Sequence, residues 1–277
     1  MNPRTAFVFG GGGVLGATQV GMLHALLDRG IAPDLIVGTS VGALNGAMLA
    51  ADPSPAMVGR LAEVWSSLSR AGVFSDSVVA QVARLAAQRT HLHSTSALRE
   101  LLAEHLGRRR IEELPVRFEC VAASIERSVA HWFATGPVVD AVVASCSVPG
   151  LFPPARVPVG DRAEHFYDGG LVHSIPVGRA ARLGAERIYV LHVGRIEHPL
   201  QPPRWPWQVG MVAFEIARRN RFVEEMAALT GGTTVHVLPS GEPEGRTVNL
   251  RYRDMRRVGE RIDRARVATA EYLDGAA

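Results

Sequence analysis

The chain of 277 residues is long enough for one large α/β domain with a small appendage. Its hydrophobic fraction of 47% and charged fraction of 21% are ordinary for a globular protein. The net charge is +3 and all 30 basic residues are arginines, but no basic stripe is interleaved with aromatic residues. We therefore expect no nucleic-acid partner, whereas attraction to an anionic lipid surface stays open.

Two cysteines, Cys120 and Cys146, lie in apolar segments without metal-ligand spacing, so we expect reduced core residues in a cytoplasmic protein. Two uncharged stretches, Thr5–Leu27 and Leu35–Ala51, superficially resemble membrane spans. Polar residues and the four glycines Gly10–Gly13 interrupt them, which is typical of buried parallel strands followed by sheet-covering helices. We expect a soluble protein that is at most peripheral to a membrane.

The spacing of apolar residues predicts the elements in chain order. The first half contains a strand at Ala6–Phe9, a helix at Leu15–Leu27, a strand at Leu35–Val37, and helices at Ala43–Ala51, Ala56–Leu68, Val78–Gln88 and Ser96–Leu106. Then come strands at Val116–Ala123 and His131–Ala134, a helix at Val138–Ala144, a rigid proline-rich loop at Pro149–Pro158, a strand ending at Phe166–Tyr167 and a strand at Ile188–Val193. The last predicted elements are a helix at Val212–Leu229, an added strand at Thr234–Leu238 and a helix at Met255–Tyr272.

The βαβ order at the start of the chain predicts an α/β fold with a doubly wound, mainly parallel sheet. We expect the main domain to cover residues 4–195, with residues 56–106 as a helical excursion within it. The composition changes beyond Arg195, because Pro199–Trp207 holds four prolines and two tryptophans. Residues 196–277 are expected to form a mostly helical extension packed on the same domain.

The segment Gly38–Gly42 reads GTSVG and joins a predicted strand to a predicted helix. A serine between two glycines at such a junction is typical of a nucleophile elbow, a sharp turn that exposes one hydroxyl. The alternative is a glycine-rich connection in which Ser40 only caps the following helix.

A second glycine-rich segment, Gly11–Gly16, reads GGGVLG and fits G-x-G-x-x-G between a strand and a helix. This pattern is the dinucleotide-binding fingerprint, which expects an acidic residue at the end of the second strand. Asp34 stands before that strand instead, and the end of the strand carries the serine turn. The glycine loop can equally direct backbone N–H groups at a phosphate or at the oxyanion of an ester under attack.

Because consecutive parallel strands end at the same sheet edge, the glycine loop and Ser40 are expected to face one crevice. A serine there needs a base to accept its proton. Four histidines follow late enough for the order of an α/β-hydrolase triad, but none stands in a distinctive motif: His173, His192, His198 and His236. Asp168 is the stronger candidate, since it ends a predicted strand before Gly169-Gly170, although turn aspartates are common.

With these motifs in order, the chain resembles the patatin-like phospholipases, in their bacterial branch, from about Arg4 to Gly194. GGGVLG at Gly11–Gly16 is similar to the family's oxyanion-hole loop, and GTSVG at Gly38–Gly42 to its nucleophile elbow. ASCSVPGLFPP at Ala144–Pro154 resembles the segment Ser-x-x-x-Pro-x-x-Phe-Pro-Pro beside the active site. DGGLVHSIPV at Asp168–Val177 resembles the Asp-Gly-Gly motif.

The resemblance implies a three-layer α/β/α fold that hydrolyses acyl esters of lipids, with Ser40 as nucleophile and Asp168 as proton acceptor in a Ser-Asp dyad. It implies no catalytic histidine, cofactor or metal. The glycines it assigns to the oxyanion hole are Gly11, Gly12 and Gly13, and its remaining motif glycines are Gly16, Gly38, Gly42, Gly169 and Gly170. One position departs from the family pattern, because Leu15 replaces a usual Arg or Lys. An acyltransferase with the same site, or a non-catalytic lipid- or dinucleotide-binding protein, stays an alternative.

Overall fold

The computed structural model describes residues 4–71, 93–193, 199–204, 206–229, 231–242 and 257–276. Within them, one eight-stranded sheet has the order β5-β6-β3-β2-β1-β7-β8, and β4 pairs with β3 off this path. The strands are β1 Thr5–Phe9, β2 Leu35–Thr39, β3 Arg117–Ser124, β4 Val129–Phe133, β5 Ala155–Val159, β6 Arg162–Asp168, β7 Arg187–Leu191 and β8 Thr234–Val237.

The centre of the sheet is parallel, because β1 pairs with β2 and β7, β2 with β3, and β7 with β8, all in parallel. Antiparallel pairing is confined to the side that carries β4, β5 and β6. This arrangement confirms the prediction of an α/β fold with a mainly parallel central sheet. It also brings the carboxyl ends of β1 and β2 to the same edge, since Phe9 is in register with Gly38.

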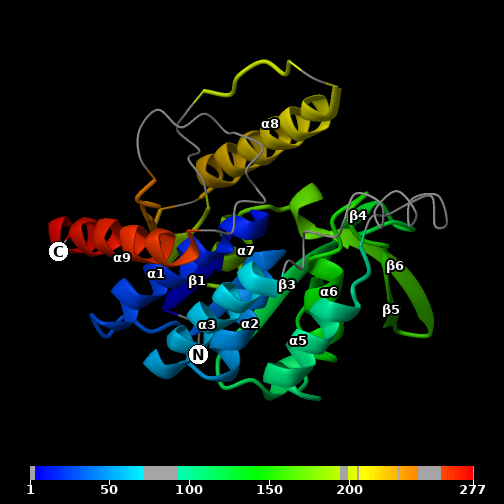
Figure 1. Cartoon of the computed structure of the whole chain (residues 1–277), viewed down its shortest axis with the longest axis horizontal. Coiled ribbons are helices and arrows are strands. Elements are labelled where there is room, and N and C mark those ends of the chain that lie inside the picture. Colours follow the sequence, from blue (N-terminus) through cyan, green and yellow to red (C-terminus); the bar gives the residue numbers. More distant parts are fainter. Residues whose placement is uncertain are drawn as a thin grey trace.

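Helices cover both faces of the sheet (Figure 1). The side chains of β1 alternate between two apolar clusters, with Phe7 and Phe9 in the larger one and Ala6 and Val8 in the smaller one. The larger cluster takes residues from α1 Ala17–Leu27, α2 Val41–Ala51, α3 Pro55–Ala71, α5 Ser96–Leu106, α6 Val138–Ser145 and α9 Val258–Gly275. The smaller cluster takes residues from α7 Val177–Arg182 and α8 Pro206–Ala227. The described residues also include the short 3-10 helices η1 Gly13–Gly16, η2 Ile111–Glu113 and η3 Gly169–Leu171.

One predicted element is wrong in part. The rigid loop expected at Pro149–Pro158 ends at Pro154, and Ala155–Val159 is strand β5, paired antiparallel with β6. Proline lacks the N–H that a central strand must donate, but β5 is the edge of the described sheet, and an edge strand tolerates proline. The prediction underestimated how well an edge strand accommodates proline.

Other predicted elements differ from the structure only at their ends or lie outside the described residues. The helix Ser96–Leu106 is confirmed at both ends, whereas α8 begins at Pro206, six residues before its predicted start. The predicted helix Val78–Gln88 lies outside the described residues. The division into residues 4–195 and 196–277 stays a prediction. Within the second part, β8 extends the main sheet and α9 packs on α1.

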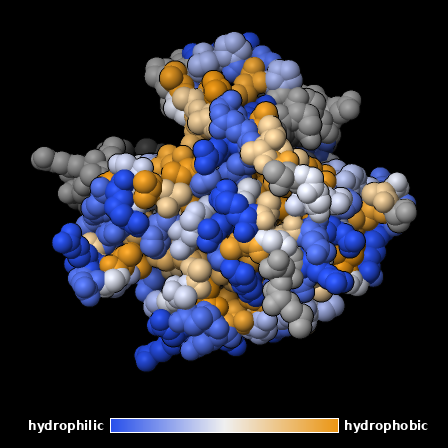
Figure 2. Space-filling model, turned by 180° about the vertical axis from the view of Figure 1, so that it is seen from behind, coloured by the Kyte–Doolittle hydropathy of each residue, from blue (hydrophilic) through white to orange (hydrophobic). Residues whose placement is uncertain are grey.

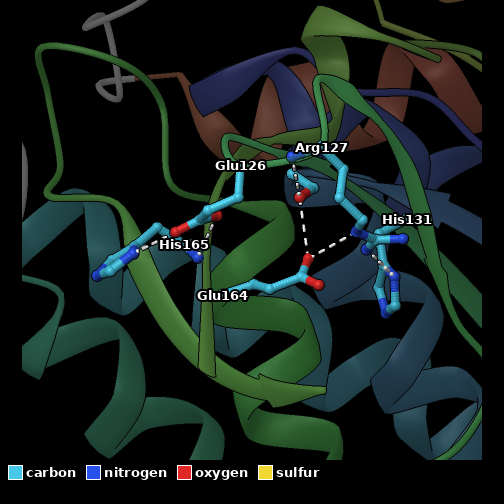
Figure 3. A network of polar contacts seen from close by, with 6 residues as sticks. Glu126, Arg127, His131, Glu164 and His165 are labelled. Carbon is cyan, nitrogen blue, oxygen red and sulfur yellow. Dashed lines mark hydrogen bonds and ion pairs between the residues drawn. The ribbon is translucent and has the colours of Figure 1, made fainter. Parts of the chain in front are cut away.

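A network of polar contacts fixes β6 beside the turn between β3 and β4 (Figure 3). Glu164 of β6 accepts a hydrogen bond from Nε of Arg127 at 2.8 Å, and Oε1 of Glu126 contacts Nδ1 of His165 at 2.7 Å. Both contacts join the turn to β6, which ends at Asp168. The network therefore helps to set the position of Asp168 relative to the end of β3.

Cys120 and Cys146 are both buried free thiols. Burial raises the pKa of both thiols above the ordinary range, and for Cys146 the charge of Asp168 adds to the effect. Across the helices that the structure describes, none is both long enough and apolar enough to span a bilayer.

Candidate active site

Ser40 occupies a strained turn between β2 and α2. Its φ of 55° and ψ of −128° lie outside the regions that a side-chain-bearing residue ordinarily adopts. Such strain is typical of functional positions, where the surrounding structure enforces the conformation. A nucleophile elbow needs this geometry, and Ser40 is the residue at which the sequence predicted it.

The motif glycines around Ser40 stand where neighbouring backbone leaves no room for a side chain. A Cβ at Gly42 would lie 2.4 Å from the carbonyl oxygen of Phe9, and one at Gly38 would lie 2.7 Å from Cα of Ala43. The same holds for Gly169, whose Cβ would lie 2.1 Å from the carbonyl oxygen of Val121. Because these glycines carry no side chain, the elbow and the Asp-Gly-Gly turn can pack directly against the neighbouring backbone.

The structure brings Ser40 and Asp168 together. Oγ of Ser40 donates a hydrogen bond of 2.5 Å to Oδ2 of Asp168, across 128 residues of sequence. Oδ1 of Asp168 accepts a second hydrogen bond of 2.7 Å from the N–H of Gly170. Both side chains are buried, with Ser40 6% and Asp168 5% exposed.

Burial raises the pKa of Asp168 from 3.8 to about 6, even though the hydrogen bonds from Ser40 and Gly170 act in the opposite direction. Above this pH the side chain is a carboxylate that can accept the proton of a hydroxyl group. A base with a pKa near neutrality is suited to taking up and returning a proton within one reaction cycle.

Ser145 fixes the backbone of the elbow, a role that the sequence did not reveal. Its Oγ accepts a hydrogen bond of 2.9 Å from the N–H of Ser40 and donates one of 2.6 Å to the carbonyl oxygen of Val121. Ser145 is fully buried at the end of α6. It is also the serine that begins the Ser-x-x-x-Pro segment, so the motif was visible although its function was not.

The glycine loop lies directly beside Ser40, as the parallel order of β1 and β2 predicted. A Cβ at Gly11 would lie 3.4 Å from Cβ of Ser40 and 3.6 Å from Oγ of Ser174. The N–H of Gly10 donates to the carbonyl oxygen of Leu191 at 3.0 Å, and that of Gly11 to the carbonyl oxygen of Ser174 at 2.9 Å. The first part of the loop is therefore fixed by the end of β7 and by the segment that follows η3.

A buried side-chain network that no sequence motif predicted holds both ends of this loop. Nε2 of Gln19 donates to the carbonyl oxygen of Gly10 at 2.7 Å, and Nδ2 of Asn45 donates to that of Gly16 at 3.0 Å. Nδ2 of Asn45 also donates to Oε1 of Gln19 at 2.7 Å, and Nε1 of Trp65 donates to Oδ1 of Asn45 at 2.9 Å. Asn45 belongs to α2, the helix that follows Ser40. Its hydrogen bond to Gly16 therefore connects this helix directly to the glycine loop.

Arg218 of α8 brings a cation to the glycine loop. Its Nη1 donates to the carbonyl oxygen of Gly11 at 3.3 Å, while Nε contacts Oε1 of Glu215 at 3.1 Å. Leu15, which replaces the basic residue usual in the resembled motif, is only half-buried within η1. A guanidinium group therefore reaches this loop from a distant helix rather than from the loop itself.

Asp34, the acidic residue nearest to the one that a dinucleotide site would need, lies away from the glycine loop. Oδ2 of Asp34 accepts a hydrogen bond of 2.9 Å from the N–H of Thr5, the first residue of β1. Asp34 thus lies at the opposite edge of the sheet from the glycine loop. The described part of the chain contains no group of three or more His, Cys, Asp or Glu side chains placed to hold a metal ion.

The histidines considered as bases have other surroundings. Nδ1 of His173 contacts Oε1 of Glu225 at 2.5 Å, and its Nε2 lies 3.3 Å from Nη2 of Arg221, so both ring nitrogens face α8. His236 stacks on Tyr189 with ring centroids 4.8 Å apart. His192 is buried at the end of β7, and His198 lies outside the described residues.

An α/β fold with a serine at a strand-to-helix turn and a buried carboxylate within hydrogen-bond distance is typical of serine-dependent ester hydrolases. The chain belongs to the patatin-like phospholipase family, whose model matches residues 7–181. This match confirms the family that the motifs predicted, which is a family of enzymes that hydrolyse lipid esters.

Relatives and a solved structure extend the comparison. The patatin-like phospholipase domain-containing protein ZK370.4 of Caenorhabditis elegans is 33% identical over 194 residues, which are 69% of this chain and 14% of that protein. Lysophospholipase nte1 of Aspergillus terreus is 32% identical over 194 residues, 69% of this chain and 12% of that protein. The chain thus spans about one-seventh or less of the length of these relatives. VipD from Legionella pneumophila is similar in structure, with a TM-score of 0.47 and 14% identity over 99% of this chain and 67% of that one.

Proposed function

We propose that the chain is a lipid acyl hydrolase of phospholipase, lysophospholipase or carboxylesterase type, with Ser40 as nucleophile and Asp168 as its base. The observation that carries the proposal is the hydrogen bond of 2.5 Å from Oγ of Ser40 to Oδ2 of Asp168. The strained conformation of Ser40, with a φ of 55° and a ψ of −128°, supports it, because backbone strain of this kind clusters at active sites.

In the proposed reaction, Oγ of Ser40 attacks the ester carbonyl carbon while its proton passes to Oδ2 of Asp168. The carbonyl electron pair moves onto oxygen, which gives a tetrahedral oxyanion. Collapse of this intermediate breaks the ester bond, and the leaving alcohol takes the proton from Asp168. Asp168 then removes a proton from a water molecule as that water attacks the carbonyl carbon of the acyl-serine. When the bond between the acyl carbon and Oγ breaks, Asp168 returns this proton to Oγ, and the fatty acid leaves.

Backbone N–H groups of the glycine loop are proposed to stabilise the oxyanion. The N–H of Gly11 already donates to Ser174, so this role falls to Gly12 and Gly13, together with the N–H of Val41 at the start of α2. A helix start beside the nucleophile favours negative charge. Loss of one such donor typically lowers the rate about 100- to 1,000-fold.

The proposed substrate is an acyl ester of a lipid, reached through contact with a membrane surface. Ester cleavage itself depends on the dyad and backbone donors, which Leu15 leaves intact. An acyltransferase would use the same residues and differ only in whether an alcohol replaces water as acyl acceptor. The product formed with and without added alcohol distinguishes the two reactions.

The proposal is tested by reacting the purified protein with a fluorophosphonate probe and locating the adduct by mass spectrometry. We expect labelling at Ser40 in the wild type and a fall of at least about 100-fold in the labelling rate of Asp168→Asn. Ser147→Ala is the matched control, because Ser147 is equally buried nearby but its Oγ donates to the carbonyl oxygen of Val143. Normal labelling of Asp168→Asn would remove Asp168 as the base. A folded wild type that is not labelled would favour a non-catalytic lipid-binding protein.

A further inference from the structure

Helix α8 buries charged residues on its inward face. The side chains of Glu215, Arg218, Phe222 and Glu225 recur at spacings of three or four residues and are all buried, at 7% or 8% exposure. Three of these four are ionisable, whereas the inward stripe of a surface helix is ordinarily apolar. The buried charges must therefore be explained by what they contact.

The inward face of α8 holds the loops of the proposed active site. Arg218 reaches the carbonyl oxygen of Gly11, as described above. Oε1 of Glu225 contacts His173 of the Asp-Gly-Gly segment, and its Oε2 accepts a hydrogen bond of 2.7 Å from the N–H of Gly178. Phe214 lies against Gly170, since a Cβ at Gly170 would lie 2.9 Å from Cζ of Phe214. Polar contacts therefore fix the orientation of the helix together with the apolar contacts of Phe214 and Phe222.

The opposite face of α8 carries an exposed apolar stripe. Val209, Ile216 and Val223 follow one another at intervals of seven residues, two helical turns, and are 54%, 56% and 61% exposed. The small side chains of Ala213 and Ala227 are exposed on the same face. From Val209 to Val223 the stripe is roughly 21 Å long. Figure 2 shows apolar atoms on the upper lobe that contains α8.

We propose that this outer face of α8 docks on the surface of a lipid bilayer. The choice of lipid as partner rests on the proposed function, since an enzyme for lipid esters must meet an aggregated substrate. A helix with one apolar face and charged margins lies in the plane of a membrane interface. Arg204, before the helix, is an exposed cation suited to lipid phosphates.

A further feature favours a bilayer over a protein partner, because the chain carries a net charge of +3, which attracts it to anionic lipid. Since the inward face of the same helix contacts Gly11 and Gly170, docking would bring the bilayer to the element that fixes both active-site loops.

The test is co-sedimentation with phosphatidylcholine vesicles, with and without phosphatidylglycerol, using proteins that all carry Ser40→Ala so that no lipid is hydrolysed. We expect the double variant Ile216→Gln, Val223→Gln to partition into vesicles at least about tenfold less than its parent. Val267→Gln on α9 is the matched control, because Val267 is also 56% exposed and should leave partitioning unchanged. Glutamine is neutral and forms helices well, so charge repulsion and unfolding do not explain a loss.

Three results would overturn the proposal: equal partitioning of the double variant and its parent, no binding of the parent to either vesicle, or a shift from dimer to monomer in the double variant. The last result would identify a second copy of the chain as the partner of this face. With Ser40 restored, hydrolysis of a short water-soluble ester should be unchanged in the double variant. Because the vesicle test needs no turnover, failure of docking and failure of the proposed hydrolase activity are distinguished.

Discussion

Replacing Asp168 by asparagine should abolish turnover and stabilise the protein at the same time. Burial raises the pKa of Asp168 from 3.8 to about 6. Because each tenfold change in an equilibrium constant corresponds to about 1.4 kcal/mol, ionising Asp168 costs about 3 kcal/mol more in the folded protein than in the unfolded chain. Asparagine has nearly the same shape and no charge, so the Asp168→Asn variant is free of this cost.

The sign of the pH dependence follows from the direction of the shift. A carboxyl group with a raised pKa in the folded state binds its proton more tightly there, so wild-type stability falls as the pH rises from 3.8 to about 6. Above that window the full cost is present, and below it none remains. The gain in unfolding free energy of Asp168→Asn should therefore be about 3 kcal/mol at about pH 8 and close to zero at about pH 3.5.

Urea denaturation at several pH values measures this gain. Asp161→Asn, in the exposed turn between β5 and β6, is the control and should show no such pattern. The catalytic side of the same argument predicts that wild-type kcat/KM falls about tenfold for each pH unit below about 6, as the base becomes protonated. An Asp168→Asn variant that is less stable than the wild type at about pH 8, or that keeps its activity, would refute the description of Asp168 as a buried, charged base.

Three further predictions test the scaffold of the site. Ser145→Ala should slow fluorophosphonate labelling about ten-fold or more and lower the unfolding free energy by about 1–3 kcal/mol, since the N–H of Ser40 loses its buried acceptor; an unchanged rate would mean that Ser145 does not position Ser40. Gly42→Ala should lower the unfolding free energy by more than about 2 kcal/mol, because the added methyl group clashes with β1. The control is Gly59→Ala, whose methyl group meets no atom within 4 Å and should raise the unfolding free energy by up to about 1 kcal/mol. Thermal melts of both variants measure the difference. Burial alone would raise the pKa of Glu225, but hydrogen bonds from His173 and from the N–H of Gly178 lower this pKa overall. The ionised Glu225 side chain therefore stabilises the folded protein at neutral pH, and this stabilisation disappears as the pH falls through the lowered pKa. Glu225→Gln should therefore cost about 1–3 kcal/mol near pH 7 and little near pH 3, and an equal loss at both would contradict this account.

The main elements of the fold and the core of the candidate site were predictable because they depend on local signals and one topological rule. Apolar runs located β1 and β2, and the glycine patterns located the loop and the elbow. The rule that adjacent parallel strands end at one edge then predicted that Gly11 and Ser40 would meet. Asp168 was selected by its position after a strand and by a family motif, although it joins the site across more than 120 residues.

The residues that sequence reasoning missed depend on tertiary contacts that no local pattern encodes. Gln19 and Asn45 look like ordinary polar residues in helices, and only the packed structure shows that both hold the glycine loop. Nothing in the sequence indicates that Arg218 lies inside, where the carbonyl oxygen of Gly11 and the carboxylate of Glu215 hold its guanidinium group. The strand β5 was missed because its one proline, Pro158, is compatible with a sheet edge, and the location of the edge is known only once the strand order is known.

The positive φ of Ser40 lowers the folding stability of this protein at a residue that its proposed activity requires. A glycine at position 40 would adopt the same turn without strain, just as asparagine at position 168 would lie buried without charge. Both substitutions remove a proposed catalytic group, and both are expected to raise the melting temperature. A directed-evolution campaign that ranks variants of this chain by heat resistance alone would therefore enrich inactive proteins first, and an activity screen has to accompany every round.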